Sequence, residues 1–191
     1  MSLLNVNTIE PSTGTDITLG ASGDTITVPS GATIANAGTA TGFGVAGTVL
    51  FQATGTTSQT GLTDNTATKR NFVSEIFDTA SAYDTSTSKF TVPSGQGGKY
   101  LISANVNMEA ANGVVENTEM QIRVNGTAVR NTMLKSNNNE FDRFDMNLTT
   151  ILNLSASDYV EIYGNLNTND SSTWNMYSGA PTSVFTGFRI A

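Results

Sequence analysis

An alternation of apolar and polar residues at every second position constrains the fold of this chain more than any other feature of its sequence. From Tyr100 to Met108 one set of alternate residues is apolar and the other is mostly polar, and Phe144 to Leu154 follows the same pattern apart from Thr150. Successive side chains of a β-strand point to opposite faces of its sheet, so this period predicts strands with one buried face. No window of the sequence carries the apolar stripe of a helix.

Further short runs of this kind fill the chain after about residue 46, and turn residues separate them. Asn125-Gly126 follows the alternating run from Met120 to Val124 and is the strongest short-range signal for a two-residue hairpin turn. The other predicted strands are Thr48 to Gln52, Asn71 to Phe77, Phe90 to Val92, Ala128 to Leu134, Val160 to Leu166 and Val184 to Ile190. Many short strands with turns between them predict an all-β sandwich or barrel.

The composition agrees with an all-β chain and argues against disorder. Charged residues make up 13% of the sequence, and Thr, Ser, Asn and Gly fill much of the remainder. A disordered chain would carry more charge, whereas Thr favours strands and Asn and Gly favour turns. The net charge is −7, and the nine Lys and Arg residues are scattered along the chain. Because binding to a phosphate backbone needs a basic stripe, we expect no nucleic-acid partner.

The chain contains neither Cys nor His. The absence of Cys excludes disulfides, thiol catalysis and Cys-ligated zinc. The absence of His removes the commonest general base and the commonest imidazole metal ligand, so a Ser-His-Asp triad cannot be built. Two carboxylates can hydrolyse a glycoside, but no pair of them stands out in this sequence. We therefore expect a non-enzymatic protein that needs no cofactor.

The start of the chain, MSLLNVNTIEPS, lacks the basic and long apolar regions of a signal peptide. No stretch approaches the roughly 20 apolar residues of a membrane span. We therefore expect synthesis in a host cytoplasm and no membrane partner. If the protein ends up outside a cell, another route must carry it there, and release inside a virion is one such route.

The first part of the chain differs from the remainder, and the sequence predicts two regions, 1–45 and 46–191. Short apolar-alternating units, namely Asp16 to Leu19, Thr25 to Val28 and Ala32 to Ile34, are separated by turns that contain Gly or Pro. Strands this short cannot close a core alone, so they need copies of themselves or another surface. A flexible leader is the alternative, but the regular spacing of the apolar residues favours an extended, strand-forming attachment arm. Residues 35–47 are small and Gly-rich, as in a linker.

Several segments after residue 46 match a known family in their order and spacing. They are Phe77-Asp78, Tyr83-Asp84, Lys89 to Pro93, Gly98 to Ile102, Ile122 to Gly126, Leu152 to Glu161 and Val184 to Ile190. Together they resemble the globular head of the complement subcomponent q family, which shares the tumour-necrosis-factor-like jelly roll. The resemblance covers about residues 46–191 and implies a jelly-roll β-sandwich preceded by a short extended or β N-terminal arm.

The same resemblance implies a compact homotrimer around a three-fold axis, which requires a sheet that is apolar on its outer side as well. Leu101 and Ile151 lie opposite the main core face of their strands, and so does either Phe185 or the pair Phe188 and Ile190. Scattered apolar residues occur on any protein surface, so the alternative is ordinary exposure. We predict Leu101, Ile151, Phe188 and Ile190 as the trimer interface.

The N-terminal segments from Leu4 to Ile9 and from Ile17 to Ile34 are similar to segments of phage tail fibres and other virion appendages, which are frequent in phages of aquatic bacteria such as cyanobacteria. This similarity implies a capsid decoration (cement) protein on the outer surface of a phage head. Its arm would bind the major capsid protein or another virion component through Leu3, Leu4, Val6, Ile9, Ile17 and Leu19. The alternative is a receptor-binding tip or short fibre that recognises a glycan or protein on the host surface.

Two loops are rich in oxygen atoms that could contact a cation. Glu140, Asp142 and Asp145 could supply some of the about six to eight oxygen ligands that calcium needs, although Arg143 interrupts them. The run from Asn167 to Ser172 is similar. We expect both to be solvated loops, so the sequence predicts no metal site.

Two aromatic residues, Trp174 and Tyr177, follow the second of these loops. Exposed aromatic rings can stack on a sugar or anchor an interface. The alternative is a loop that folds back on the sandwich and buries its rings, and this is the arrangement that we expect.

Overall fold

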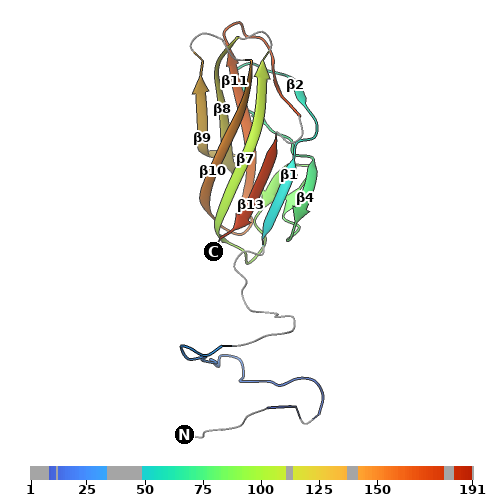
Figure 1. Ribbon diagram of the computed structural model, residues 1–191, viewed down its shortest axis with the longest axis vertical. Helices are drawn as coiled ribbons and strands as arrows, with labels where there is room; N and C mark the ends of the chain where they lie inside the picture. Colours follow the sequence, from blue (N-terminus) through green and yellow to red (C-terminus); the bar gives the residue numbers. More distant parts are fainter. Residues whose placement is uncertain are drawn as a thin grey trace. The chain divides into compact units, whose positions relative to one another are not determined.

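The computed structural model describes residues 9–11, 13–33, 49–110, 114–136, 142–178 and 183–190. The chain divides into two units, Met1–Phe43 and Gly44–Ala191. The second unit is a β-sandwich of two antiparallel sheets (Figure 1). The predicted linker, residues 35–47, lies outside the described residues, so the predicted boundary after residue 45 stays a prediction.

The alternating segments build one sheet of seven strands and one of six. Sheet A contains β1 (Leu50–Thr54), β2 (Gln59–Leu62), β4 (Ser74–Asp78), β7 (Gly98–Ala110), β10 (Arg143–Leu154), β12 (Trp174–Met176) and β13 (Val184–Arg189). Sheet B contains β3 (Thr68–Lys69), β5 (Tyr83–Asp84), β6 (Lys89–Thr91), β8 (Val115–Val124), β9 (Thr127–Lys135) and β11 (Tyr159–Thr168). The described ranges hold no helix, so the predicted all-β class is confirmed, and none of their segments has the helical length and apolarity that a membrane span needs.

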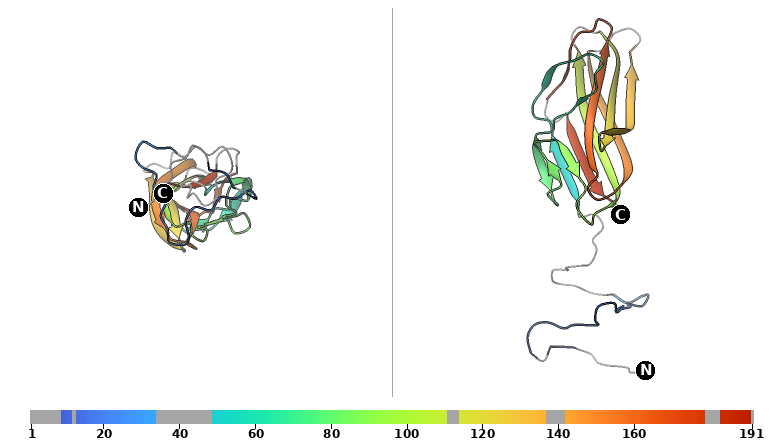
Figure 2. Two further views of the ribbon diagram at one scale, coloured as in Figure 1. Left: turned by 90° about the horizontal axis from the view of Figure 1, so that it is seen from below. Right: turned by 180° about the vertical axis from the view of Figure 1, so that it is seen from behind.

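The strand order is that of a jelly roll. Sheet A runs β2-β12-β7-β13-β1-β4, and β10 pairs with the other edge of β7 along its whole length. Strands β10, β7, β13, β1 and β4 therefore lie side by side in Figure 1. Sheet B runs β5-β6-β11-β8-β9, with β3 paired to β11. In the right panel of Figure 2, which shows the molecule from behind, sheet B is the layer nearer the viewer. The chain crosses repeatedly from one sheet to the other, as two interlocked Greek keys require.

The apolar face of each alternating strand lies in the core between the sheets. Every second residue from Tyr100 to Met108 is buried, as predicted, and so are most of the alternate residues from Phe144 to Leu154. Phe51 stacks on Phe90 with 4.6 Å between ring centroids and meets Phe185 edge-on at 4.9 Å. Aromatic pairs of this kind add about 0.5–1.5 kcal/mol each beyond the area that they bury. Burial of the inward-facing residues therefore holds the two sheets together.

The predicted hairpin forms at Asn125-Gly126, between β8 and β9. Both residues have positive φ angles, 51° and 80°, as a type I′ turn requires. Asn125 also ties the hairpin to the next turn, because its Nδ2 donates to Asp158 Oδ1 over 2.7 Å. This hydrogen bond lowers the pKa of the Asp158 carboxyl below its usual range.

The strand predicted from Asn71 is shorter than expected, since β4 begins at Ser74. Phe72 is fully buried, and its backbone N–H donates to Ser88 Oγ over 2.9 Å instead of joining a ladder. Because the Phe72 ring is buried in the core, residues 71–73 do not pair in the sheet, and the strand begins only at Ser74. The strand predicted from Thr48 to Gln52 is β1, which begins at Leu50 and continues to Thr54, and Thr48 lies outside the described residues.

Arg70, two residues before Phe72, is fully buried, and no carboxylate among the described residues pairs with it. Its guanidinium donates to uncharged oxygens at 3.1 to 3.4 Å: the carbonyls of Gly55, Thr57, Met176 and Tyr177, and Oε1 of Gln59. Desolvation lowers the pKa of Arg70 to about 10. A Cβ at Gly55 would lie 2.2 Å from Arg70 Nη2, so any larger residue there would displace the guanidinium. Arg70 therefore fastens the β1–β2 loop and the end of β12 to the core.

The strands predicted in the N-terminal segment do not form in the described part of that segment, residues 9–11 and 13–33. The segment is extended and turns at glycines, with backbone hydrogen bonds from Asp24 to Ala21 and from Ala32 to Pro29. Its side chains are exposed almost throughout. These units are three to four residues long, and strands this short bury too little apolar surface to form a stable sheet on their own.

Candidate functional site

A row of apolar side chains crosses the outer face of sheet A. The strand register places Ile151 of β10 opposite Leu101 of β7, Leu101 opposite Phe188 of β13, and Phe188 opposite Leu50 of β1. In each strand these residues alternate with buried core residues, so they point away from the core. The register therefore joins residues from four parts of the chain into one continuous row.

Two further apolar residues flank this row. Phe77 of β4 lies opposite Gln52 of β1 in the next row, and Ile190 follows β13 and donates its backbone N–H to Lys99 O over 2.7 Å. The exposed fractions of the side chains are 56% for Ile151, 42% for Phe188, 40% for Ile190 and 39% for Phe77. We call the six residues Leu50, Phe77, Leu101, Ile151, Phe188 and Ile190 the apolar patch. A contiguous exposed apolar patch of this kind is typical of an interaction surface.

All four residues predicted for a trimer interface lie in the apolar patch. The sequence left a choice between Phe185 and the pair Phe188 and Ile190, and the structure buries Phe185 in the core while exposing the pair. Leu50 and Phe77 were missed. The available signal was a break in alternation, because Leu50 stands between apolar neighbours in Val49-Leu50-Phe51 and Phe77 follows Ile76.

Polar side chains continue this outer face along β7 and β10. Four consecutive cross-strand pairs form the polar ladder: Ser103 with Thr149, Asn105 with Asn147, Asn107 with Asp145, and Glu109 with Arg143. The first three pairs are hydrogen-bonded at 2.8, 2.7 and 2.8 Å, and the fourth is an ion pair. The ladder therefore gives the outer face of sheet A, over the second half of β7, a fixed arrangement of hydrogen-bond donors and acceptors.

The ion pair at the end of the ladder is covered by an exposed aromatic ring. The Arg143 guanidinium lies 4.2 Å from the centre of the Tyr177 ring, within the range of a cation–π contact. Its hydrogen bond to Glu109 raises the pKa of Arg143. Arg143 and Tyr177 thus form a partly exposed cluster beside the end of β12.

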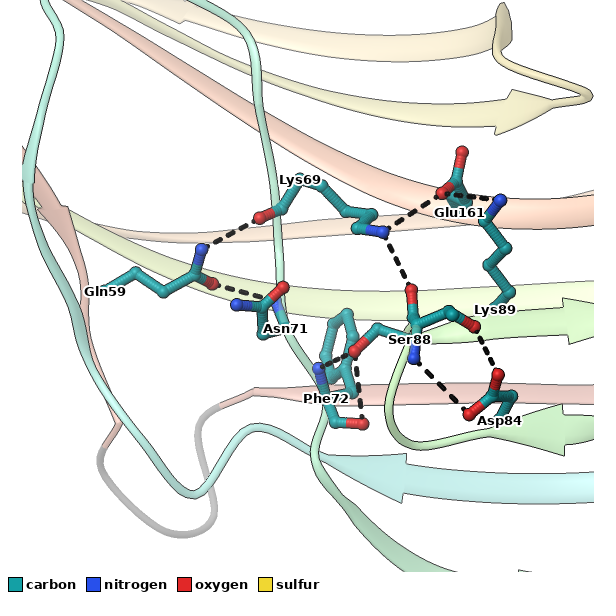
Figure 3. A network of polar contacts seen from close by, with 9 residues as sticks. Gln59, Lys69, Asn71, Phe72, Asp84, Ser88, Lys89 and Glu161 are labelled. Carbon is teal, nitrogen blue, oxygen red and sulfur yellow. Dashed lines mark hydrogen bonds and ion pairs between the residues drawn. The ribbon is translucent and has the colours of Figure 1, made fainter.

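The outer face of sheet B has a different chemistry, which centres on a buried carboxylate (Figure 3). Glu161 is only 4% exposed, and its Oε1 lies 3.3 Å from Lys69 Nζ and 3.8 Å from Lys89 Nζ. Lys69 also donates to Thr87 O over 2.8 Å. The register places Arg123 opposite Glu161 on the same face. Charges of both signs are therefore neighbours across this sheet.

Two tyrosines on that face are covered by cations. Lys89 Nζ lies 4.1 Å from the ring centre of Tyr159, and the Arg123 guanidinium lies 3.9 Å from that of Tyr163. Arg123 also donates from Nε to Gln121 Oε1 over 2.9 Å. The polar and aromatic groups of sheet B thus find partners within the same chain.

A hollow of about 370 Å³ opens beside the β5–β6 hairpin, lined by residues 80–84 and 91–94. The ionisable side chains in its lining are Tyr83 and Asp84. Asp84 accepts hydrogen bonds from the hydroxyls of Ser86 and Thr87, which lower the pKa of this exposed carboxyl to about 2. Burial raises the pKa of Tyr83 above its usual value, and its hydroxyl donates to Phe72 O. Neither group is poised to exchange protons near neutral pH.

No protein-family model matches the chain, and no curated protein matches it significantly. Solved structures do match it. Eiger TNF from S. frugiperda superposes with a TM-score of 0.57 at 12% identity, covering 75% of this chain and 92% of that one. Murine APRIL superposes with a TM-score of 0.54 at 8% identity, covering 74% and 98%. The globular domain of zebrafish complement 1qA protein has a TM-score of 0.45 at 14% identity, covering 75% and 98%.

The fold is a tumour-necrosis-factor-like jelly roll. Similarity at such low identity establishes the arrangement of strands and leaves function to the surfaces described above. The jelly roll predicted from the sequence is thus confirmed.

The jelly roll contains one of the two predicted aromatic residues in its core. Trp174 is fully buried in β12, where its Nε1 donates to Thr63 O over 2.8 Å, so the folded-back alternative is correct for this ring. Tyr177 stays partly exposed against Arg143. The sugar-stacking hypothesis therefore keeps only Tyr177.

The oxygen-rich loops hold no cluster of three or more acidic, His or Cys side chains close enough to bind a metal, as far as the described residues extend. Asp145 belongs to the polar ladder, and hydrogen bonding from the side chain and the backbone of Ser172 lowers the pKa of Asp170. Glu140 lies outside the described residues. Asp145 and Asp170 thus use their carboxylates in hydrogen bonds within the chain.

Three of the predicted arm residues are described, and three are not. Ile9, Ile17 and Leu19 are all exposed, as are Ile26 and Val28 further along the segment. Leu3, Leu4 and Val6 lie outside the described residues. The described residues of the arm thus present apolar side chains that their own unit does not bury.

Proposed function

We propose that this chain is a non-enzymatic structural protein of a bacteriophage virion, which forms homotrimers through the outer face of sheet A and decorates the head through its N-terminal segment. The apolar patch is the observation that carries the homotrimer. Outward-facing residues of a solvated sheet are normally polar, yet here six apolar residues from five strands and a strand end share one surface.

Burial of this patch supplies a driving force for self-association. Removing a large apolar side chain from water contributes about 1.5–3 kcal/mol. The patch reaches from β10 at one side of sheet A to β4 at the opposite edge, so its two ends can meet different neighbours. Contacts between two different surfaces close into a ring when the rotation permits, and the resemblance of the sequence to trimeric heads favours a ring of three.

The N-terminal segment fits an attachment role for the same physical reason. Ile17, Leu19, Ile26 and Val28 are exposed and recur at alternate positions in two short units. Extended segments of this kind gain backbone hydrogen bonds and apolar burial when they lie against the surface of another protein. Three such segments on one trimer bind with avidity, because each binding event raises the effective concentration of the next. The virion assignment itself rests on the similarity of this segment to virion appendages.

The attachment role is tested by changing Ile17, Leu19, Ile26 and Val28 to Ser together in the full-length chain. We expect trimers to persist in solution while binding to purified empty heads is lost, because the apolar side chains alone are removed. The matched control changes Thr18, Thr25 and Thr27 of the same segment to Ser and should bind heads normally. Full head occupancy by the first variant would refute the attachment mechanism.

A second candidate function is recognition of the host surface, and the cluster of Tyr177 and Arg143 favours it. An aromatic ring stacked on a guanidinium beside a polar ladder offers both a stacking surface and hydrogen-bonding groups to a glycan. Purified trimers would then adsorb to host cells and block infection, and Tyr177→Ala would reduce both effects. Labelled protein imaged on virions distinguishes the two candidates, because decoration places it on the head and host recognition places it on the tail.

A further inference from the structure

We propose that Asn125-Gly126 is a latent deamidation site, which the folded chain keeps intact through hydrogen bonds of the Asn125 side chain with residues 158 and 159. The inference is independent of the proposed function and of any assembly. Asn125 and Gly126 form the hairpin between β8 and β9, and both are exposed to solvent. Burial therefore does not protect this pair, and protection has to come from the contacts of its side chain.

The reaction at this site needs only the chain and water. The backbone nitrogen of Gly126 attacks Cγ of Asn125, and a new C–N bond closes a cyclic succinimide. Nδ2 leaves as ammonia, carrying the proton that the Gly126 nitrogen loses. Water then opens the ring to aspartate or isoaspartate, and nothing is oxidised or reduced. Because glycine has no side chain beside the attacking nitrogen, an Asn-Gly pair is unusually prone to this reaction.

Both polar atoms of the Asn125 side chain are held by the start of β11 and the turn before it. Nδ2 donates to Asp158 Oδ1 over 2.7 Å, and Oδ1 accepts from the backbone N–H of Tyr159 over 3.0 Å. Attack requires the Gly126 nitrogen and Cγ to meet in one particular geometry, so the carboxamide has to leave these partners. Ring closure also needs a rotation about the Asn125 Cα–C bond that a type I′ turn does not have.

Asp158 is the stronger of the two anchors because it is a carboxylate. Its Oδ2 accepts from the backbone N–H of Ser155 over 2.8 Å, while its Oδ1 accepts from Asn125. The hydrogen bonds from Asn125 and Ser155 lower the pKa of Asp158, so this group is ionised near neutral pH. Hydrogen bonds to charged groups are stronger than those between neutral groups. The negative charge also opposes loss of the proton from the Gly126 nitrogen nearby.

The products of the reaction would not fit the same hairpin. Hydrolysis replaces the Nδ2 donor of Asn125 by an oxygen, so two carboxylates would meet where a donor and an acceptor now lie 2.7 Å apart. The isoaspartate form also adds a methylene group to the backbone of a two-residue turn, whose length fixes the register of the two strands. The fold therefore favours the amide over both products.

The test follows the tryptic peptide of residues 124–130, in which Asn125 is the only amide side chain. The full-length protein is kept in mildly alkaline buffer, either folded or unfolded in guanidinium chloride. Mass spectrometry measures the rate at which Asn125 becomes aspartate or isoaspartate. Because the hairpin has to open before the reaction, the folded chain should react roughly 100-fold more slowly than the unfolded chain. Equal rates in the two states would overturn the inference.

A substitution at Asp158 tests the source of the protection. Asp158→Ser removes the carboxylate but keeps a hydroxyl that can accept from the Ser155 backbone, so the turn should persist. We expect the folded variant to deamidate at Asn125 roughly tenfold faster than the wild type, because a charge-assisted hydrogen bond is lost. A wild-type rate in this variant would show that Asp158 does not protect the site, and the inference would fail.

The matched control is Asp170→Ser, since Asp170 also holds a turn, accepting from the backbone N–H of Ser172 over 3.0 Å. This variant should deamidate at Asn125 as slowly as the wild type, and a faster rate would show that loosening any turn suffices. Circular dichroism checks that each variant is folded. Should Asp158→Ser fail to fold, Asp158→Asn, which removes only the charge, replaces it with the same two outcomes.

Discussion

The outer faces of sheets A and B follow the same two-residue period, yet they differ in how their side chains are satisfied. On sheet B the charged groups around Glu161 find partners within the chain, namely Lys69 and Lys89 at Glu161 and Arg123 on the Tyr163 ring, and Met133 of β9 is an isolated exposed apolar residue. On sheet A the apolar patch leaves Ile151 56% exposed and Phe188 42% exposed. A face whose groups are paired is complete as a monomer surface, whereas a face with exposed large apolar groups gains free energy from a partner.

This difference shows that the outward-facing residues of a strand decide whether the sheet can bind another protein. The inward positions of both sheets are alike, because both are apolar and buried in one core. Substitutions on the two outer faces should therefore separate effects on association from effects on folding, and substitutions at buried polar groups should affect folding alone.

The largest effect is expected at Arg70, which belongs to neither outer face. Arg70→Met removes the donor for five buried or partly buried oxygens, and we expect the free energy of unfolding to fall by about 3–5 kcal/mol. Urea denaturation followed by the fluorescence of the single Trp, Trp174, measures the change. Arg123→Met on the outer face of sheet B is the control and should cost much less. If both variants lost the same free energy of unfolding, burial would not be the reason that Arg70 matters more than Arg123.

A smaller effect, on association rather than folding, is expected at Phe188. Because Phe188 is 42% exposed in the single chain, Phe188→Ser should change monomer stability by no more than about 0.5 kcal/mol. It should nevertheless convert trimers to monomers at micromolar concentration, since loss of a central aromatic anchor costs about 2–4 kcal/mol of binding. Sedimentation equilibrium measures this. Tyr163→Ser on sheet B should leave the trimer intact, and dissociation by both variants alike would remove the distinction between the faces.

Glu161 should have an intermediate effect on folding. Glu161→Gln keeps the shape of the side chain but leaves Lys69 and Lys89 close together without a carboxylate. Hydrogen bonds to charged groups contribute about 1.5–3 kcal/mol, and Gln retains part of this, so we expect a loss of about 1–2 kcal/mol in denaturant unfolding. Glu119→Gln, which removes a carboxylate bonded to Asn131 on the same face, should change stability less. A wild-type stability for Glu161→Gln would mean that the two lysines do not depend on this carboxylate.

The smallest effect is expected at Asp84, which is exposed and holds the β5–β6 turn. Its folded pKa of about 2 lies below the usual value of about 3.9 for an unfolded chain. A lowered carboxyl pKa stabilises the folded state above the unfolded pKa, and this contribution is lost as the pH falls from about 4 to about 2. Asp84→Asn should therefore lower the melting temperature slightly at pH 7 and make no difference near pH 2. A gap between the two melting curves that stays constant with pH would contradict this assignment.

The long strands were predictable because a sheet with one buried face and one solvated face requires apolar residues at every second position of its strands. From Tyr100 to Met108 every second residue is apolar and the residues between them are polar apart from Leu101, and β7 contains all nine. The turn at Asn125-Gly126 was predictable because few residue pairs accept two positive φ angles. Local chemistry alone decides both features.

Other features depend on neighbours that are distant in sequence. The strand β12 has only three residues, too few to show a period, and its strand character comes from pairing with β7 and β2. The burial of Arg70 is equally invisible, because its acceptors come from Gly55 to Gln59 and from Met176 to Tyr177. Conversely, the N-terminal units have the period of strands, but a period does not supply the partner that a strand needs.

The sequence by itself determined the all-β fold, the two faces of each strand and the absence of His and Cys chemistry, because each depends on residue identity and local spacing. It also indicated Leu101, Ile151, Phe188 and Ile190 as outward apolar residues. Only the tertiary structure decided that Leu50 and Phe77 join them and that the polar ladder adjoins them. The reason is register: which residues of separate strands lie opposite one another follows from the packing of the whole sandwich, and no single segment encodes it.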